Sequence, residues 1–257
     1  MASASKSGPD QIGRLKILDI WVDPVGREGA LRRVKGFLQG DGGSRVIFAS
    51  NPEKAFSVPR NPDLYDTFRS ADLLIPDGIG MVLAARILHG VRLERVPGVE
   101  LMEEICSLCA SNGSGIFVYG SREEVNKRAV DRLRGAHPDL RVSGRSHGYV
   151  QEPEMPALID KINASRAEVL FVGLGSPKQE KWIMRYKDTL NHVKLIQGIG
   201  GTLDTIAGTV KRAPRAWRKV HLEWLYRLLN EPRRIKRQRV IPIFVYLLLK
   251  ERLGKSI

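Results

Sequence analysis

Short apolar runs alternate with amphipathic stretches along most of the chain, and this alternation restricts the folds that it can adopt. The apolar runs are Ile17–Val22, Arg45–Ala49, Leu73–Ile75, Ile116–Tyr119, Val169–Gly173 and Lys194–Gln197. The stretches with helical periodicity are Glu28–Leu38, Gly80–His89, Val99–Ser111, Glu123–Arg134, Glu154–Ala164 and Lys178–Tyr186. Continuous apolar strands separated by helices are typical of parallel sheets covered on both faces. The sequence therefore predicts an α/β fold with a doubly wound parallel sheet flanked by helices.

The positive charge of the protein is concentrated near the C-terminus. Residues Thr209–Ile257 hold 14 Lys and Arg against 3 Glu, so they contribute +11 of the formal net charge of +14. We expect three parts: a loose N-terminus over residues 1–13, an α/β body over 14–208, and a basic helical appendage over 209–257. A basic segment of this kind favours an anionic partner, which could be a membrane surface, a nucleic acid or a phosphorylated substrate.

The appendage also carries aromatic and apolar residues, but no stretch reaches the roughly 18 apolar residues that cross a bilayer. Its longest apolar run, Val240–Leu249, is interrupted by Pro242. Such a run can lie in a membrane interface, and Trp217, Trp224 and Tyr226 are suited to the headgroup level. We expect the appendage to associate with the membrane surface without crossing it.

The two cysteines, Cys106 and Cys109, have the C-x-x-C spacing of redox and metal sites. They fall on the apolar face of a predicted helix, together with Leu101 and Ile105, and the chain has no second pair of thiol ligands. Packing in the core is the favoured interpretation, and a reducing, cytoplasmic compartment is consistent with it.

Polar and glycine residues gather directly after five of the predicted strands. These clusters are Ala49–Glu53, Ile75–Gly80, Tyr119–Glu123, Gly173–Glu180 and Gln197–Asp204. In open α/β sheets, ligands bind beyond the carboxyl ends of the strands, where glycines admit a ligand to the backbone and helix N-termini favour phosphate. Each cluster taken singly is also what an ordinary cap or turn requires, and no G-x-G-x-x-G fingerprint is complete.

The order of these motifs is more specific than any one of them. The series is Asn51-Pro-Glu53, Pro76-Asp-Gly-Ile-Gly80, Glu94-Arg-Val-Pro-Gly98, Gly173-Leu-Gly-Ser-Pro-Lys-Gln-Glu180, Gly200-Gly-Thr-Leu-Asp204, Arg212-Ala-Pro214 and Glu223-Trp-Leu-Tyr-Arg227. From about Lys16 to Arg239 the chain resembles the WecG/TagA/CpsF glycosyltransferase family (glycosyltransferase family 26). The resemblance implies a Rossmann-like catalytic body.

The resemblance also implies an activity. Members of the family transfer a sugar, with inversion, from a UDP-sugar to a polyprenyl-diphosphate-linked saccharide at the cytoplasmic face of the cell membrane. Their products feed wall teichoic acid, enterobacterial common antigen or exopolysaccharide. The donor stays open among UDP-N-acetylmannosamine, its uronic acid and UDP-glucose, and a homo-oligomer is compatible with the sequence.

Three residues match the catalytic positions of the family. Asp77 matches the general base, Asn51 lines the same pocket, and Arg95 offsets the charge on the leaving diphosphate. The family commonly has Thr two residues before the Asn, where this chain has Ala49. Ser50 is adjacent, but strand alternation directs it to the other face. This departure bears on the donor sugar more than on the class of reaction.

Further positions match residues that bind substrate. These are Gln179 for the donor, Asp204 for the nucleoside, Gly175, Gly200 and Gly201 in the strand-end turns, and Arg227, Arg234 and Arg237 in the appendage. The chain contains no Asp-x-Asp pair, and its five histidines lack ligand spacing. We therefore expect no metal and no other cofactor, with arginines stabilising the leaving group.

Two other classes of protein compete with this interpretation. A nucleic-acid-binding protein could use the basic appendage, but the body is nearly neutral and the strand-end clusters would have no role. An NAD-dependent Rossmann enzyme needs a complete glycine fingerprint followed by an acidic residue, which the sequence lacks. We expect no nucleic-acid partner.

Overall fold

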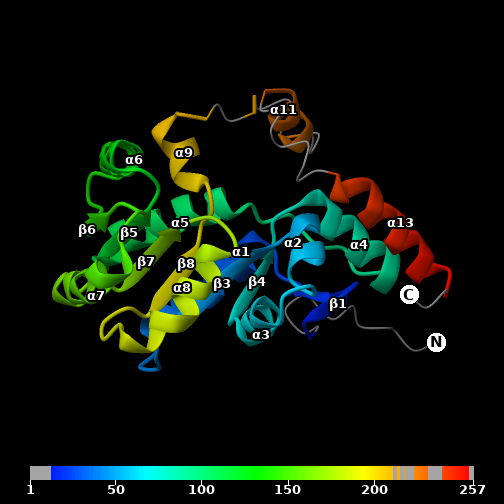
Figure 1. The fold of residues 1–257 in the computed structure, drawn as a ribbon, viewed down its shortest axis with the longest axis horizontal. Helices are drawn as coiled ribbons and strands as arrows, with labels where there is room; N and C mark the ends of the chain where they lie inside the picture. The colour runs from blue at the N-terminus through cyan, green and yellow to red at the C-terminus, as the bar shows by residue number, and fades with distance from the viewer. Residues whose placement is uncertain (1–12, 211–212, 215–216, 218–222, 231–238, 255–257) are drawn as a thin grey trace, which may run out of the picture.

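The computed structural model describes residues 13–210, 213–214, 217, 223–230 and 239–254. Its centre is a six-stranded sheet in the order β4-β3-β8-β7-β5-β6, and every pairing in it is parallel. The strands are β3 (Arg45–Ser50), β4 (Leu73–Pro76), β5 (Ile116–Gly120), β6 (Val142–Ser146), β7 (Val169–Gly173) and β8 (Leu195–Gly198). Figure 1 shows helices on both sides of this sheet. The predicted Rossmann-like α/β architecture is confirmed.

Two separate apolar cores show which helices cover each face of the sheet. One core includes α1 (Arg27–Gln39), α5 (Gly98–Asn112), α6 (Glu123–Ala136) and α9 (Thr202–Ala207). The other core includes α2 (Pro52–Ser57), α3 (Pro62–Ser70), α4 (Ile79–His89), α7 (Met155–Ala164), α8 (Lys178–Tyr186) and α13 (Val240–Arg252). Two 3-10 turns, Glu152–Glu154 and Lys187–Thr189, and helix α11 (Glu223–Asn230) complete the described helices.

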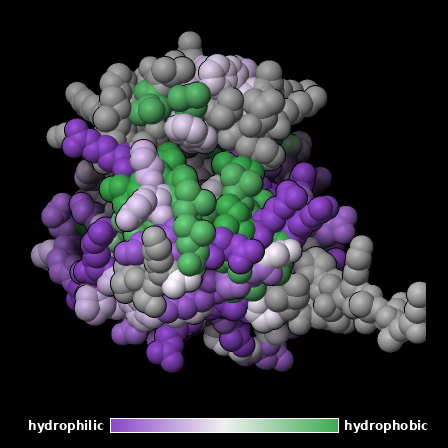
Figure 2. All heavy atoms as spheres, turned by 90° about the vertical axis from the view of Figure 1, so that its right-hand side faces the viewer, coloured by the Kyte–Doolittle hydropathy of each residue, from purple (hydrophilic) through white to green (hydrophobic). Residues whose placement is uncertain are grey.

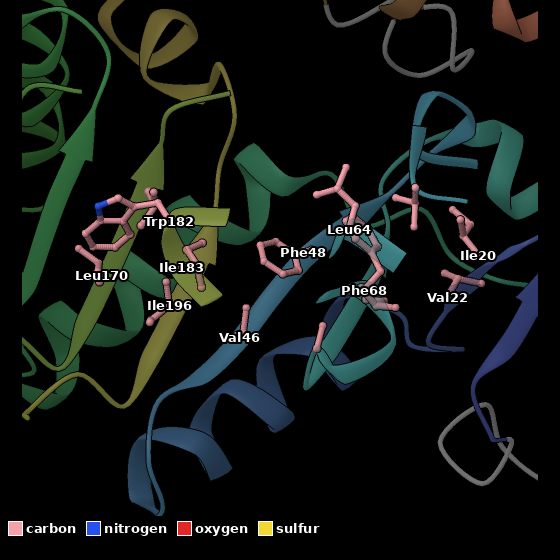
Figure 3. Packing of buried hydrophobic residues seen from close by; sticks show 14 of the residues in the cluster. Ile20, Val22, Val46, Phe48, Leu64, Phe68, Leu170, Trp182, Ile183 and Ile196 are labelled. Atoms are coloured by element: carbon pink, nitrogen blue, oxygen red, sulfur yellow. The ribbon is translucent and has the colours of Figure 1, made fainter. Parts of the chain in front are cut away.

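Figure 3 shows the second core, in which side chains from non-adjacent elements interlock. The rings of Phe48 and Phe68 stack at 5.4 Å, and the rings of Tyr119 and Trp182 lie 4.9 Å apart. Burying a side chain of this size contributes about 1.5–3 kcal/mol. This core therefore anchors β3 and α8, whose ends carry candidate site residues.

The prediction for Ile17–Val22 as a strand of the main sheet is wrong. The segment belongs to a separate antiparallel hairpin, β1 (Leu15–Ile17) with β2 (Ile20–Val22), and the turn between them uses Leu18 at φ 53°. The sixth strand of the sheet is instead β6, which the sequence pattern did not reveal. Its residues are all partly exposed at the sheet edge, so they form no apolar run.

The C-terminal helix α13 packs against the body through Phe244 and Leu248, which are buried among residues of α2 and α4. Its other side exposes apolar residues, namely Ile243, Val245, Tyr246, Leu249 and, just beyond the helix, Leu253. Figure 2 shows hydrophobic residues gathered in the middle of this face with hydrophilic residues around them. In the part of the chain that the structure describes, no helix is long and apolar enough to span a membrane.

Candidate active site

The topology predicts a ligand-binding crevice at the carboxyl ends of β3 and β8. These strands are neighbours, but the chain leaves β3 toward α2 and α3 on one face and leaves β8 toward α9 on the other. Connections that diverge in this way open a crevice between them, which is where ligands bind in open α/β sheets. The predicted site residues after β3, β4, β7 and β8 all belong to this edge.

Asn51 and Asp77 lie side by side at this edge. The parallel register pairs Ser50 with Pro76, and the backbone N–H of Asp77 donates to the carbonyl of Ser50 at 3.1 Å. A Cβ on Gly78 would lie 3.6 Å from the Cβ of Asn51. The Asn51 side chain also caps α2, because its Oδ1 accepts a hydrogen bond from the Lys54 backbone N–H at 3.0 Å.

The carboxylate of Asp77 is held at the start of α5. Its Oδ1 accepts a hydrogen bond from the backbone N–H of Gly98 at 3.0 Å, and the helix N-terminus stabilises its negative charge. The carbonyl of Gly98 accepts from Gln197 Nε2 at 3.1 Å. Gln197 is buried at the end of β8, and its Oε1 has no hydrogen-bond partner among the described residues. The sequence motif contained Gln197, but only the contacts show that it binds Gly98, the residue whose N–H holds Asp77.

Arg95 reaches the same end of β4. The next residue, Val96, donates its backbone N–H to the carbonyl of Pro76 at 2.9 Å, which ties the segment to the strand that ends in Asp77. The Arg95 guanidinium lies 3.6 Å from Glu223 Oε2 of α11, and both side chains are largely buried. A helix of the appendage thus supplies a carboxylate to the arginine that was predicted to meet the leaving diphosphate.

Gln179 is buried at the start of α8, where its Oε1 accepts from the backbone N–H of Gly200 at 2.8 Å. Gly200 adopts φ +54°, a left-handed conformation that favours glycine. At Gly198 a Cβ would lie 2.9 Å from the ring of Phe48 and 3.0 Å from Gln179 Nε2. Gln179 therefore shapes the glycine turn after β8, and its contact with the donor stays a prediction.

Gly175, Gly201 and Asp204 occupy the neighbouring turns. Gly175 adopts φ +73°, and a Cβ built on Gly201 would have no atom of the described residues within 4 Å, apart from its chain neighbours. Asp204 stands in the first turn of α9, where its carboxylate accepts from the Thr209 hydroxyl at 3.4 Å. Two of these residues thus leave room for a ligand, and Asp204 helps to close the end of α9.

The appendage residues are only partly described. Arg227 belongs to α11, but its side chain, together with Arg234 and Arg237, lies outside the described part of the chain. Within the described part, the rings of Trp217 and Tyr226 meet edge to face at 5.7 Å. The predicted arginine contacts with the site stay predictions.

The two sides of β3 confirm the prediction about Ser50. Ala49 packs with the core on the α5 side, whereas the Ser50 hydroxyl donates to the carbonyl of Trp21 on the opposite side at 2.6 Å. Ser50 therefore cannot place its hydroxyl where a Thr at position 49 would.

The C-x-x-C pair belongs to the core, as predicted. Both thiols are free and buried on α5. Burial raises the pKa of Cys109 to about 12 and raises the pKa of Cys106 strongly as well. Among the residues that the structure describes, no group of three or more His, Cys, Asp or Glu side chains comes together as a metal site.

Comparison with known proteins identifies the family of the chain. The sequence profile described as "Glycosyl transferase WecG/TagA/CpsF family" matches residues 15–257. An N-acetylglucosaminyldiphosphoundecaprenol N-acetyl-beta-D-mannosaminyltransferase of Bacillus subtilis is 35% identical over 211 residues, which cover 82% of this chain and 81% of the relative. A protein of the same name from Staphylococcus aureus is 31% identical over 238 residues, 92% of each chain. This chain is therefore a hexosyltransferase and belongs to the WecG/TagA/CpsF family of glycosyltransferases.

Proposed function

We propose that this chain transfers an N-acetyl-β-D-mannosaminyl group from its UDP donor to N-acetylglucosamine on a polyprenyl diphosphate, for cell-surface polymer synthesis. The names of the relatives support the sugar and the acceptor. The observation that carries the proposal is that Asn51 and Asp77 directly follow the paired strand ends Ser50 and Pro76, with Asp77 held at the N-terminus of α5. A carboxylate in that position is suited to act as a general base.

The proposed reaction is a single displacement. Asp77 accepts the proton of the acceptor hydroxyl while that oxygen attacks the anomeric carbon, and the bond from that carbon to the diphosphate oxygen breaks. The electron pair leaves with UDP, and the configuration inverts from the α-linked donor to a β-linked product. One carboxylate suffices for this chemistry, whereas retention by double displacement would need a second one as the nucleophile.

Negative charge develops on the leaving diphosphate, and Arg95 is the described residue that we assign to it. Its planar guanidinium can donate two parallel hydrogen bonds to phosphate oxygens. The appendage helix α11 approaches this arginine through Glu223. Arg227, Arg234 and Arg237 would add positive charge from the appendage, so that turnover needs no metal.

We further propose that the protein works as a peripheral protein on the inner face of the cell membrane, where its lipid-linked acceptor would lie. Helix α13 presents apolar side chains outward and ends in Lys250 and Arg252. Apolar residues next to cations are suited to an anionic interface, where each cation contributes about 1 kcal/mol. Because α13 packs on α2 and α4, which begin beside Asn51 and Asp77, the membrane face and the site share the same helices.

The decisive experiment measures UDP release with a lipid-linked N-acetylglucosamine acceptor in detergent. Asp77→Asn should lower kcat by about 10²- to 10⁴-fold with unchanged UDP binding, because only the base is lost. Asp41→Asn, at an exposed position away from the site, serves as the matched control. Wild-type turnover by Asp77→Asn would disprove the assigned base, and the absence of UDP binding by the wild-type protein would refute the donor.

Two further arms of the same assay test the metal and the donor. Activity should persist in EDTA, and loss of activity that Mg²⁺ or Mn²⁺ restores would refute a metal-free reaction. UDP-N-acetylmannosamine is the expected donor, and its uronic acid and UDP-glucose are the alternatives. Preference for one of these two would associate Ala49, the residue that departs from the family, with a changed donor pocket.

A further inference from the structure

A buried ion pair lies beside the crevice and has no role in the reaction as described. The Lys54 ammonium contacts both the Ser176 hydroxyl and Glu180 Oε1. The side chain of Lys54 is 11% exposed and that of Glu180 is 1% exposed. Lys54 belongs to α2, after β3, and Glu180 belongs to α8, after β7. Since β8 lies between these strands, the ion pair passes beside the end of β8.

Each partner is bonded to a residue of the candidate site. The backbone N–H of Lys54 donates to Asn51 Oδ1 at 3.0 Å. On the other side, Gln179 Nε2 lies 3.4 Å from Glu180 Oε1, and Gln179 Oε1 accepts from the Gly200 N–H. Hydrogen bonds joined through the Lys54 side chain therefore connect Asn51 to the glycine turn after β8.

Stability alone does not account for this pair. Two apolar side chains of similar volume commonly stabilise a buried position as well as an ion pair does, because both charges lose their hydration. The surroundings are apolar, and the Lys54 ammonium lies 5.1 Å from the centre of the Phe68 ring. Glu180 Oε2 is buried without a hydrogen-bond partner among the described residues, which is unfavourable. What the ion pair supplies, and an apolar contact does not, is a defined distance and direction between α2 and α8.

We propose that Lys54 and Glu180 are positioning residues that set the spacing between Asn51 and the Gln179–Gly200 contact, and so determine how the donor is bound. The inference rests on the proposed function in one respect, namely that the donor occupies this crevice. Neither residue touches the reacting atoms. Donor binding and the protection of the connected backbone amides should therefore depend on the pair, even where the fold does not.

The test replaces both charges together, since removing one would leave the other buried and uncompensated. In the Lys54→Met/Glu180→Gln variant the side chains keep a similar length. The control removes an exposed ion pair of α8 and α3, Lys181 with Asp63 at 3.4 Å, as Lys181→Met/Asp63→Asn. Both proteins are compared with wild type by thermal unfolding, calorimetric UDP binding, steady-state kinetics and amide hydrogen exchange.

We expect the Lys54→Met/Glu180→Gln protein, the neutral variant, to have a Tm within about 5 °C of that of the wild type. Its donor KM and its UDP Kd should rise about tenfold or more, with a smaller change in kcat, because misplaced contacts weaken binding. The backbone amides of Lys54 and Gly200 should exchange faster. The control should match wild type in all of these measurements.

A folded neutral variant with wild-type donor KM and wild-type amide protection would overturn the inference. If that variant does not fold, Ser176→Ala replaces it, because it removes only the exposed hydroxyl that contacts Lys54. Ser176→Ala should then raise the donor KM several-fold, whereas Lys54→Arg should retain most of the affinity for the donor. Unchanged kinetics in Ser176→Ala would again overturn the inference. The two proposals can also fail separately. If the wild-type protein does not bind UDP, but the amides still exchange faster in the Lys54→Met/Glu180→Gln variant, the proposed donor is refuted and the positioning role of the ion pair stands.

Discussion

Gly198 ends β8 and Gly201 precedes α9 three residues later, and their surroundings differ. A Cβ at Gly198 would meet Phe48 and Gln179 at 3.0 Å or less, whereas a Cβ at Gly201 would meet no atom within 4 Å in the described part of the chain beyond its own neighbours. The first glycine is required by the packing of the protein. The second leaves open space at the crevice, which a substrate can use.

Substitutions at these two glycines should separate stability from binding. Gly198→Ala should lower the free energy of unfolding by about 1–3 kcal/mol in urea titrations, because the added methyl group overpacks the site. Gly201→Ser should change it by less than about 0.5 kcal/mol, because Ser caps a helix as well as Gly does. If the donor approaches the backbone there, Gly201→Ser raises the donor KM at unchanged stability. An unchanged KM would remove Gly201 from the donor site.

Individual site residues could be predicted from the motif series, but the contacts that these residues make could not be predicted. Asn51 and Asp77 are separated in the sequence by α2, α3 and β4, and the strand register brings them together. Lys54 and Glu180 are 126 positions apart, in helices α2 and α8, which follow two strands, β3 and β7, that are not neighbours in the sheet. Local sequence patterns do not reveal the order of strands in a sheet. The ion pair between Lys54 and Glu180 could therefore not be predicted from the sequence.

At the level of the element, helix α5 combines two roles. Its first residue, Gly98, binds Asp77, and its inner face buries Cys106 and Cys109. Because burial raises the pKa of both thiols, the folded protein keeps them protonated at a pH at which the unfolded chain ionises them.

The stability of the protein should therefore fall as the pH rises above 9.0, the ordinary pKa of a thiol, toward about 12. In that interval the unfolded state binds fewer protons than the folded state, so the free energy of unfolding decreases by up to about 1.4 kcal/mol per pH unit for each thiol. Below pH 9 this contribution is fully present. Urea titrations between pH 8 and pH 10 measure it.

The control for this prediction is Cys106→Ala/Cys109→Ala, which lacks both thiols. Its free energy of unfolding should be lower at pH 8, because the core loses volume, and should fall less steeply toward pH 10. Equal slopes for the two proteins would show that other groups dominate the pH dependence.

The elements themselves were recovered from sequence to different degrees. Helix α8 has the predicted bounds, since its apolar face repeats with the helical period between a glycine-rich turn and Lys187. Strand β6 was missed because Val142–Ser146 is an edge strand without an apolar run. The hairpin β1–β2 was taken for one strand, because Leu18 adopts the left-handed turn conformation that a leucine rarely takes.

At the level of the whole molecule, helices α13 and α6 lie at opposite ends of the protein (Figure 1). This separation allows the membrane proposal to be tested by position as well as by charge. The exposed residues Tyr246 and Leu249 belong to the outward side of α13, away from buried Phe244 and Leu248.

Tyr246→Glu/Leu249→Glu should lower binding to phosphatidylglycerol vesicles about tenfold or more, since carboxylates neither enter the apolar interface nor approach anionic lipid favourably. Thermal stability and turnover with a short-chain acceptor in detergent should be unchanged. Sedimentation with vesicles measures the effect. Arg128→Glu/Arg134→Glu on α6 removes more positive charge at the far end of the molecule, and an equal loss of binding in this variant would refute docking through α13.

The sequence by itself determined the alternation of strands and helices, the family, and the identities of the candidate residues, because periodicity and short motifs depend on neighbours along the chain. The tertiary structure alone decided the strand order, the Asn51–Asp77 pairing, and the contacts of Gly98 with Asp77 and Gln197. It also placed Glu223 on Arg95 and Lys54 on Glu180. The physical reason is that these contacts join segments far apart in the chain, which only the packing of both faces of the sheet brings together.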